Sequence, residues 1–397
     1  MKRKLSLVLS VILILALALT GCGGSDGSSL PGNTAGDVIN IGWIGSLTGD
    51  QAVWGTCESQ MLQLLVDEVN ADGGIAGKQL NLIKYDTRGD ANEAVNSVKR
   101  LVAQDKVVAI IGPNASGQAL AITSALNDGK VPDIATVATN PKVTVNDDGS
   151  VNPYNFRVCF IDPYQGAVVG GYASDVLKYK NAAVLYDVAS DYSQGFSQYF
   201  EETFTAKGGK IVAKEGFKAG DVDFRPQLSR IKAANPDVII MPYYYKEVAL
   251  SANQARELGI KATLMGGDGW PSDQLMEMAG KAIEGSYVVN HLDFNDPEAK
   301  PLQERYAAAY DNQVLELNGY MAHDAFLLLQ SAIEKAVEDT GEVNSQAITD
   351  ALTQVEVEGV TGKIKISPET HNPDGKEAAI VKIEDKQYVF QQKYGVE

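Results

Sequence analysis

The chain has 397 residues, which is long enough for two domains, and its 45% hydrophobic and 21% charged residues exclude wholesale disorder and a coiled coil. Asp and Glu outnumber Lys and Arg by 51 to 34. The resulting formal charge of −17 argues against a nucleic-acid partner, because binding to phosphates depends on Lys and Arg. Three Cys and three His exclude a disulfide-stapled scaffold and leave little for a structural metal cluster.

The N-terminus is predicted to be an export signal over residues 1–21. Three basic residues at 2–4 precede an apolar run at 5–19, which is shorter than the roughly 20 residues that span a bilayer. The sequence LTGC at 19–22 resembles the bacterial lipoprotein signal, in which Cys22 becomes the lipid-bearing first residue of the mature protein. An uncleaved anchor and a plain secretory signal are the alternatives.

Gly and Ser dominate residues 22–37, and this composition predicts a flexible tether. Loss of residues 1–21 removes three bases and no acid, so the mature chain would carry a formal charge of −20. We therefore expect an extracytoplasmic protein, anchored by lipid to the outer face of the cell membrane (in the periplasm if the cell is Gram-negative). Its folded part is expected to start near Val38.

Short apolar segments alternate with segments of helical periodicity along the rest of the chain. Strands are predicted at 39–46, 79–85, 107–111, 133–137, 182–187, 210–215, 237–241, 262–266 and 285–290, with a strand-rich tail from about 359. Helices are predicted at 56–70, 94–102, 118–127, 166–178, 193–206, 224–234, 246–258, 298–311, 318–337 and 344–353. This alternation implies parallel sheets with helices on both faces, in too many units for one sheet, so we expect an α/β protein of two doubly wound lobes.

Catalytic motifs are missing from the sequence, which has no G-x-S-x-G elbow, H-E-x-x-H pair, P-loop or C-x-x-C. His291, His323 and His371 lie far apart in no catalytic spacing, so each is expected to be a surface residue or a satisfied core histidine. We therefore predict that the protein is not an enzyme and holds no cofactor or metal.

Polar residues follow two strands of the first half, at the sheet edge where doubly wound folds bind ligands. Ser116 begins a helix, and the free N–H groups of a helix N-terminus suit a carboxylate or phosphate. The alternative is that Ser116 only caps its own helix. Thr139 offers a hydroxyl beside carbonyls that can accept from an ammonium; the alternative there is an ordinary polar turn before Pro141.

Asp268 ends a strand of the second half between glycines (MGGDGW) that let a ligand approach. One carboxylate at a cleft is a natural partner for an ammonium group. Its alternative role is to cap the segment that starts at Pro271.

Aromatic residues occur at the same kind of place. Trp54 follows the first strand, Tyr192 follows the strand at 182–187, and three tyrosines at 243–245 follow the strand at 237–241. Three successive tyrosines cannot all be core, because alternate side chains of a strand point to opposite faces. Some of them must meet solvent or a ligand.

At these residues the sequence resembles the branched-chain amino acid-type (leucine/isoleucine/valine-binding) family of ABC transporter substrate-binding proteins. The resemblance covers the chain from about Val38 and rests on an ordered series of segments: IGWIGSLTGDQAVWG, VNADGGIAGKQLNL, YDTRGDANEAV, IIGPNASGQALA, ATNP, DPYQG, QARELGI and MGGDG. It implies a periplasmic-binding-protein type I fold, with two Rossmann-like lobes joined by three crossovers. We place lobe 1 at 38–160 plus 290–354 and lobe 2 at 161–289 plus 355–397, with crossovers near 160, 289 and 355.

The resemblance also implies roles for individual residues. Ser116 matches the residue that binds the carboxylate of an amino-acid ligand, and Ala138 and Thr139 match the turn that meets its ammonium and carboxylate. Asp268 matches the acid that pairs with the ammonium, where relatives often have the longer Glu. The pocket aromatics correspond to Trp54, Tyr192 and Tyr244, with Tyr245 the next choice among the three tyrosines.

Some relatives carry a disulfide in the first lobe, with one Cys in the segment equivalent to YDTRGDANEA, which has none here. Cys57 and Cys159 are therefore expected to be free thiols or an unusual pair, and a pair needs Cα atoms within about 7 Å.

The resemblance implies a monomeric receptor that captures an amino acid, branched-chain or apolar, between its lobes and delivers it to an ABC permease powered by a separate ATPase. A same-fold receptor for an amide, urea-like or other small carboxylate ligand is the alternative, as is a sensory binding protein.

Overall fold

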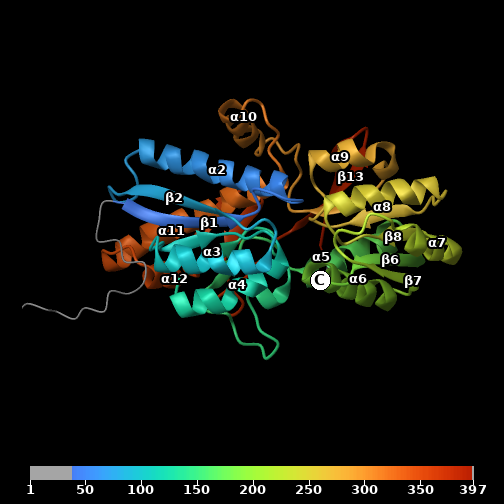
Figure 1. Cartoon of the computed structure of the whole chain (residues 1–397), viewed down its shortest axis with the longest axis horizontal. Coiled ribbons are helices and arrows are strands. Elements are labelled where there is room, and N and C mark those ends of the chain that lie inside the picture. Colours follow the sequence, from blue (N-terminus) through green and yellow to red (C-terminus); the bar gives the residue numbers. More distant parts are fainter. Residues whose placement is uncertain (1–37, 396–397) are drawn as a thin grey trace, which may run out of the picture. The chain divides into compact units, whose positions relative to one another are not determined.

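A computed structural model describes residues 38–395, and the predicted signal at 1–21, Cys22 and the predicted tether lie outside these residues. The first of two lobes (Figure 1) contains an all-parallel sheet in the order β2-β1-β3-β4-β5. Its strands are β1 (Val38–Gly45), β2 (Gln79–Asp86), β3 (Ala109–Ile111), β4 (Asp133–Ala135) and β5 (Asn155–Arg157).

Helices cover both faces of this sheet, as the alternating pattern predicts. They are α2 (Ala52–Ala71), α3 (Ala91–Ala103), α4 (Ser116–Gly129), α11 (Leu317–Thr340) and α12 (Ser345–Leu352). One face packs Trp43 and Met61 against Phe326 of α11, and the opposite face packs Leu101 against Ile122. The carboxyl ends of the strands are left uncovered, since each helix runs back along its own face.

The second lobe contains a seven-stranded sheet in the order β14-β13-β10-β9-β8-β6-β7. Its strands are β6 (Asn181–Asp187), β7 (Lys210–Phe217), β8 (Val238–Ile240), β9 (Thr263–Gly266), β10 (Tyr287–Asn290), β13 (Ala378–Glu384) and β14 (Gln387–Tyr394). The strands from β7 to β10 are parallel, whereas β13 runs antiparallel to β10 and β14 antiparallel to β13. The expected α/β fold of two doubly wound lobes is confirmed.

Helices again pack on both faces of this sheet. They are α5 (Asp162–Gly171), which continues as a π-helical turn (Tyr172–Val176), α6 (Asp191–Ala206), α7 (Arg225–Ala234), α8 (Tyr245–Glu257) and α9 (Asp273–Ala279). Val168 of α5 and Phe200 of α6 lie in the core on one face, and Leu228 and Val248 lie in the core on the other. Short 3-10 turns occur at Pro141–Val143 and Gly280–Ile283, and α10 (Lys300–Ala309) precedes α11.

The chain passes between the lobes three times: after β5, after β10 and before β13. The third passage corrects the expected boundary at 355. The hairpin of β11 (Glu356–Gly359) and β12 (Gly362–Lys365) belongs with the first lobe, because Ile364 and Ile366 pack in its core. The chain therefore crosses between Ile366 and Ala378.

The hairpin stays on the first lobe because its turn is fastened to α11. Asp324 of α11 accepts hydrogen bonds from the backbone N–H groups of Val360 and Thr361, both at 2.9 Å. A Cβ at Gly359 would lie 2.4 Å from the carboxyl carbon of Asp324, so only glycine allows this approach. These contacts span more than 30 residues of sequence, which is why strand periodicity alone did not reveal them.

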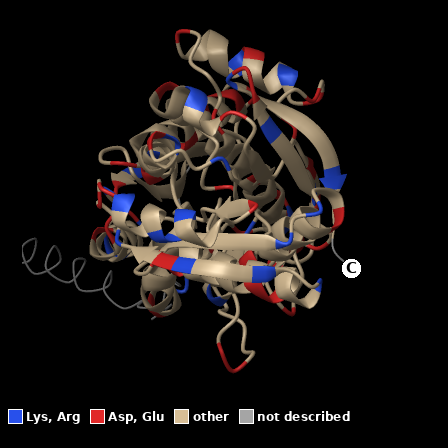
Figure 2. Cartoon of the chain, turned by 90° about the vertical axis from the view of Figure 1, so that its right-hand side faces the viewer, with Lys and Arg blue, Asp and Glu red and all other residues tan. Residues whose placement is uncertain are grey.

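Acidic and basic residues are interspersed along the outer helices and loops (Figure 2). In the described part of the chain, no helix is long and apolar enough to cross a membrane. The same residues contain no group of three or more His, Cys, Asp and Glu side chains placed to hold a metal ion.

Candidate functional site

A small cavity lies where the carboxyl ends of the two sheets meet. The first lobe lines it with Gln51, Trp54, Asn114, Ala115, Val137 and Asn318, and the second lobe with Tyr192, Tyr244, Asp268 and Gly269. Its volume is about 10 Å³, which is the space of a single water. A larger hollow of about 690 Å³ shares Gln51, Ala115 and Tyr244 with it. The lobes are therefore closed on each other, and an organic ligand can enter only when they separate.

Three aromatic rings form one wall of the cavity. The rings of Tyr192 and Tyr244 stack with centroids 5.6 Å apart and planes 5° apart. Trp54, from the first lobe, meets Tyr244 edge-on at 5.5 Å. The indole Nε1 of Trp54 donates to the backbone carbonyl of Pro271 at 3.1 Å, and the hydroxyl of Tyr192 accepts from the N–H of Gly269 at 3.3 Å. The wall is thus apolar in its faces, and the indole N–H of Trp54 and the hydroxyl oxygen of Tyr192 are already bonded to the backbone.

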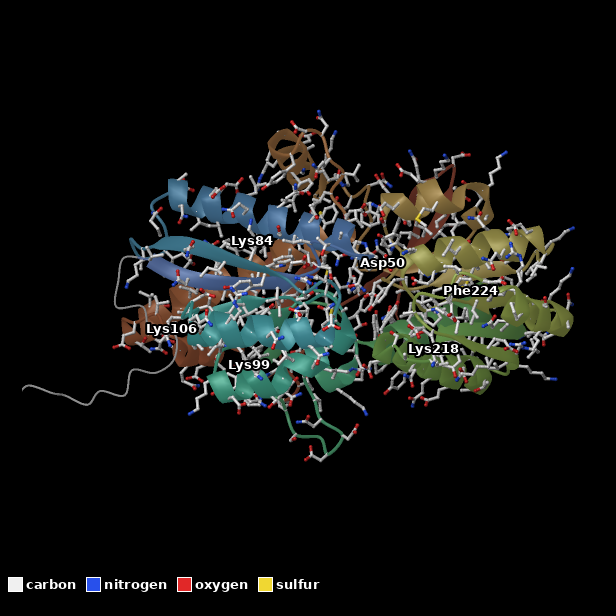
Figure 3. All side chains as sticks on the ribbon, viewed as in Figure 1. Asp50, Lys84, Lys99, Lys106, Lys218 and Phe224 are labelled. Atoms are coloured by element: carbon white, nitrogen blue, oxygen red, sulfur yellow. The ribbon has the colours of Figure 1, made fainter. Side chains whose placement is uncertain are left out.

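The three successive tyrosines have three different environments. Tyr243 is buried in the second-lobe core, where its hydroxyl bonds with Ser251 at 2.9 Å, and Tyr244 lines the cavity. Tyr245 joins the lobes by donating from its hydroxyl to the backbone carbonyl of Asp50 at 2.7 Å. The carboxylate of Asp50 also forms an ion pair with Lys246 at 2.6 Å, and Figure 3 shows Asp50 where the lobes meet.

The polar side of the cavity contains Asp268, which is paired with a histidine. Its Oδ2 lies 3.0 Å from Nε2 of His291, and the two side chains are only 2% and 1% exposed. The ring of His291 stacks on Phe160 with centroids 3.7 Å apart. His291 is a buried core histidine, one of the two expected outcomes, but its partner is a residue that lines the cavity. Asp268 follows β9 and His291 follows β10, and only the structure shows that these two strands are neighbours.

A second carboxylate, that of Asp162 at the start of α5, is fully buried nearby. Its Oδ1 accepts from Nε2 of Gln165 at 2.9 Å, and its Oδ2 has no hydrogen-bond partner among the described residues. Burial raises the pKa of Asp162 to about 7, and the negative charge of Asp268 raises it as well. The site therefore concentrates negative charge and unpaired acceptor atoms.

Arg157 is a fully buried cation, and its two Nη atoms bond to backbone carbonyls. Its Nη1 donates to the carbonyl of Ala138 at 2.6 Å and its Nη2 to the carbonyl of Asn140 at 2.8 Å. The same turn is held by Thr139, whose Oγ1 accepts from Nε2 of Gln165 at 3.2 Å. The turn is thus rigid before any ligand arrives.

Ser116 is the first residue of α4 and does not cap its own helix. Ala115 is the N-cap, and Oγ of Ser116 accepts instead from the backbone N–H of Asn140 at 3.2 Å. Ser116, Ala138 and Thr139 do not line the cavity themselves, although their neighbours Ala115 and Val137 do. The structure therefore brings Trp54, Tyr192, Tyr244 and Asp268 together at the cavity wall and places the other three predicted residues just behind it.

Sequence reasoning missed several lining residues. Both polar side-chain atoms of Asn114 are buried without a partner among the described residues, and its place in the GPNASG turn was the available signal. Asn318 donates to Oε1 of Glu58 at 3.1 Å, and Glu58 also accepts from Thr136 and Trp43. Burial raises the pKa of Glu58 to about 7. Asn318 lies inside a helical pattern, so its sequence carried no sign of a role.

Cys57 and Cys159 are both buried and free, which settles the two alternatives in favour of thiols. Cys57 lies on α2, and its Sγ contacts the backbone carbonyl of Glu316.

Comparison with known proteins agrees with this architecture. The model of the family described as periplasmic binding protein matches residues 38–387. The chain belongs to the periplasmic binding protein family. A Leu/Ile/Val-binding protein of Rhizobium johnstonii is 30% identical over 329 residues, covering 82% of this chain and 86% of the relative.

Two solved structures of leucine- and isoleucine-type binding proteins have the same fold. The leucine binding protein LivK of Thermotoga maritima is 31% identical with a TM-score of 0.82, covering 90% of this chain and 99% of that one. The branched-chain amino acid transporter substrate binding protein LivJ of Streptococcus pneumoniae, in complex with isoleucine, is 32% identical with a TM-score of 0.81 and the same coverage. The expected periplasmic-binding-protein type I fold is thereby confirmed.

Proposed function

We propose that the protein captures a zwitterionic amino acid, branched-chain or otherwise apolar, between its lobes and delivers it to an ABC permease. One observation carries this proposal: an interlobe cavity joins an aromatic wall to a buried carboxylate. The names of the relatives, which specify leucine, isoleucine and valine, support the same ligand class.

The ligand's ammonium would pair with Asp268. No Lys or Arg is among the residues that line the cavity, and Arg157 is occupied by backbone carbonyls. The charge of Asp268 raises the cost of ionising the buried Asp162, and a bound cation offsets that cost. The carbonyl of Ala138 has a second lone pair, and the hydroxyl of Thr139 is beside it, so both can assist.

The ligand's carboxylate would lie at the N-terminus of α4. The backbone N–H groups of the first turn and the positive end of the helix dipole favour an anion there. Oγ of Ser116 accepts from Asn140, which leaves its hydroxyl hydrogen free to donate to the carboxylate. The positions of Ser116 and Asp268 in different lobes would place the two charges of one ligand on opposite sides of the cleft.

The ligand's side chain would contact the rings of Trp54, Tyr192 and Tyr244. Aromatic faces bury large apolar areas, and the polar atoms of Trp54 and Tyr192 are already paired with the backbone. An aliphatic side chain would therefore enter without breaking the hydrogen bonds of Trp54 and Tyr192. A charged side chain would find no group of opposite charge among these three rings.

Binding would be coupled to closure of the lobes. The cavity is too small for free entry, and its walls come from both lobes, so a ligand that contacts both walls stabilises the closed state. The closed protein would then dock on the permease. Lipid attached to Cys22, which the N-terminal sequence predicts, would keep the monomeric protein at the outer face of the membrane.

A thermal-shift screen of the twenty amino acids, with a chain that starts at residue 23, tests the proposal. Leu, Ile and Val should raise the melting temperature most, since a ligand at 100 times its Kd adds about 2.7 kcal/mol. 4-Methylpentanoate, which is leucine without its ammonium, should stabilise much less. Equal stabilisation by both would favour a receptor for small carboxylates, and no shift with any amino acid would overturn the proposal.

A further inference from the structure

His291 lies at a junction between the cleft and the segments that connect the lobes. It follows directly on β10, where the chain leaves the second sheet for the first lobe. Its Nε2 lies 3.0 Å from Oδ2 of Asp268, and its ring stacks on Phe160, which lies on the first crossover just before α5. Two crossover segments thus hold one imidazole against the carboxylate of the site.

The hydrogen bonds of His291 determine its neutral form. Because the Asp268 oxygen is an acceptor, Nε2 carries the proton in the neutral ring. Nδ1 is buried and has no hydrogen-bond partner among the described residues. A second proton on the ring would therefore go to Nδ1, in a place with no acceptor to receive it.

We infer that His291 positions the Asp268 carboxylate for the ligand's ammonium and that a second proton on His291 weakens ammonium binding. The inference rests on the proposed function. It identifies a positioning residue for the site and a proton whose release accompanies ligand binding.

Charge competition is the physical basis of this coupling. Neutral His291 occupies one oxygen of Asp268 and leaves the full negative charge to attract an ammonium at the other oxygen. Protonated His291 would neutralise that charge and place a second cation beside the ligand. The ligand and the proton therefore exclude each other in part, and by linkage each lowers the affinity of the other.

Several charged side chains act on this pair. Burial lowers the pKa of His291, and Asp268 opposes that effect. The other ionisable groups near the pair come from the end of β5, the first crossover, the start of α5, α11 and the third crossover: Arg157, Cys159, Asp162, His323, Asp324 and Lys376. The negative charge of Asp324 favours protonation of His291 and the positive charge of Lys376 disfavours it. Among all these groups, Asp268 is the one whose carboxylate bonds directly to the imidazole of His291.

Asp162 would add a second pH effect of the same sign. Its pKa is raised to about 7, so acidification removes its negative charge and also weakens attraction for an ammonium. The wild-type pH profile would therefore contain two contributions, and a variant at each position is needed to separate them.

Isothermal titration with L-leucine between pH 5 and pH 8 tests the inference in the wild type, His291→Gln and Asp162→Asn. Gln keeps an N–H donor for Asp268 but cannot take a proton. In the wild type, Kd should rise toward acid by up to about tenfold per pH unit for each linked proton. His291→Gln should remove one part of this rise, Asp162→Asn should remove the other part, and the double variant should show neither. His371→Gln is the matched control, because His371 bonds to the backbone carbonyls of Asn152 and Asn155 outside the cavity, and its slope should equal that of the wild type.

A rise in Kd that is equally steep in His291→Gln and the wild type would overturn the inference while leaving the proposed function intact. Absence of leucine binding at every pH would overturn both. A measurement on the wild type covers the case in which His291→Gln does not fold. The Cε1–H NMR signal of His291 reports its pKa. Saturating leucine should lower this pKa, and an unchanged pKa would contradict the inference.

Discussion

The indole Nε1 of Trp54 donates a hydrogen bond to the backbone carbonyl of Pro271, which lies 217 residues farther along the chain. Trp54 belongs to α2 of the first lobe, and Pro271 precedes α9 of the second. This bond closes one side of the cavity, and the same ring contacts Tyr244 and Tyr245. A single first-lobe side chain thus makes polar and aromatic contacts with the second lobe.

Trp54→Ala should weaken leucine binding by about 100-fold, because it removes an almost fully buried aromatic side chain from the closed interface. Trp54→Phe keeps a ring against the tyrosines and loses only the bond to Pro271, so its loss should be about tenfold or less. Titration calorimetry measures both, and small-angle scattering should show a larger radius of gyration for leucine-saturated Trp54→Ala. An affinity within about threefold of wild type for Trp54→Ala would contradict this role.

Asp268→Asn should raise the Kd for leucine by about 10- to 150-fold, because a hydrogen bond between charged groups contributes about 1.5–3 kcal/mol. Binding of 4-methylpentanoate, which has no ammonium, should not weaken. Asp147→Asn is the control, since Asp147 is a solvent-exposed acid of the first lobe whose ion pair with Lys142 is far from the cavity lining. Unchanged leucine affinity in Asp268→Asn would remove Asp268 from the ammonium site.

Cys57 and Cys159 should be inert toward a thiol reagent such as DTNB in the folded protein. Burial raises the pKa of each thiol to about 12, so almost no reactive thiolate forms near neutral pH. A chain that starts at residue 23 contains these two cysteines only, and denaturation in guanidinium chloride should release two equivalents. Rapid modification before unfolding, or no release after it, would contradict the assignment as buried free thiols.

Asp133→Asn should stabilise the protein more at pH 8 than at pH 5. Both Oδ atoms of Asp133 are buried without a hydrogen-bond partner among the described residues, and burial holds its pKa well above the usual value of 3.8. The folded state therefore keeps a proton that the unfolded state loses. Between the two pKa values, the free energy of unfolding falls by about 1.4 kcal/mol per pH unit as pH rises.

Urea unfolding of wild type and Asp133→Asn at the two pH values checks this expectation. Comparing the two proteins cancels the titration of the other groups, so the difference in unfolding free energy isolates Asp133. The same difference at pH 5 and pH 8 would show that Asp133 titrates normally in the folded state.

Much of the fold was predictable because it depends on local periodicity. Alternation of strand and helix patterns is a property of neighbouring residues, and it indicated both lobes and the strand ends that carry Thr139 and Asp268. Strand β5 was missed because it has only three residues and ends in Arg157. A charged residue normally indicates an exposed position, whereas Arg157 is buried. The chain tolerates that charge because three backbone carbonyls and the hydroxyl of Thr144 accept from the guanidinium.

The sequence by itself determined the α/β class, the two lobes and the aromatic and acidic residues of the cavity wall (Trp54, Tyr192, Tyr244 and Asp268), because chain-local patterns specify strands, helices and their ends. Only the tertiary structure decided that His291 contacts Asp268, that Trp54 reaches Pro271 and that the β11–β12 hairpin stays with α11. Each of these contacts joins segments that are 23 to 217 residues apart. They depend on which strands become neighbours and how the lobes close, and no local pattern records either.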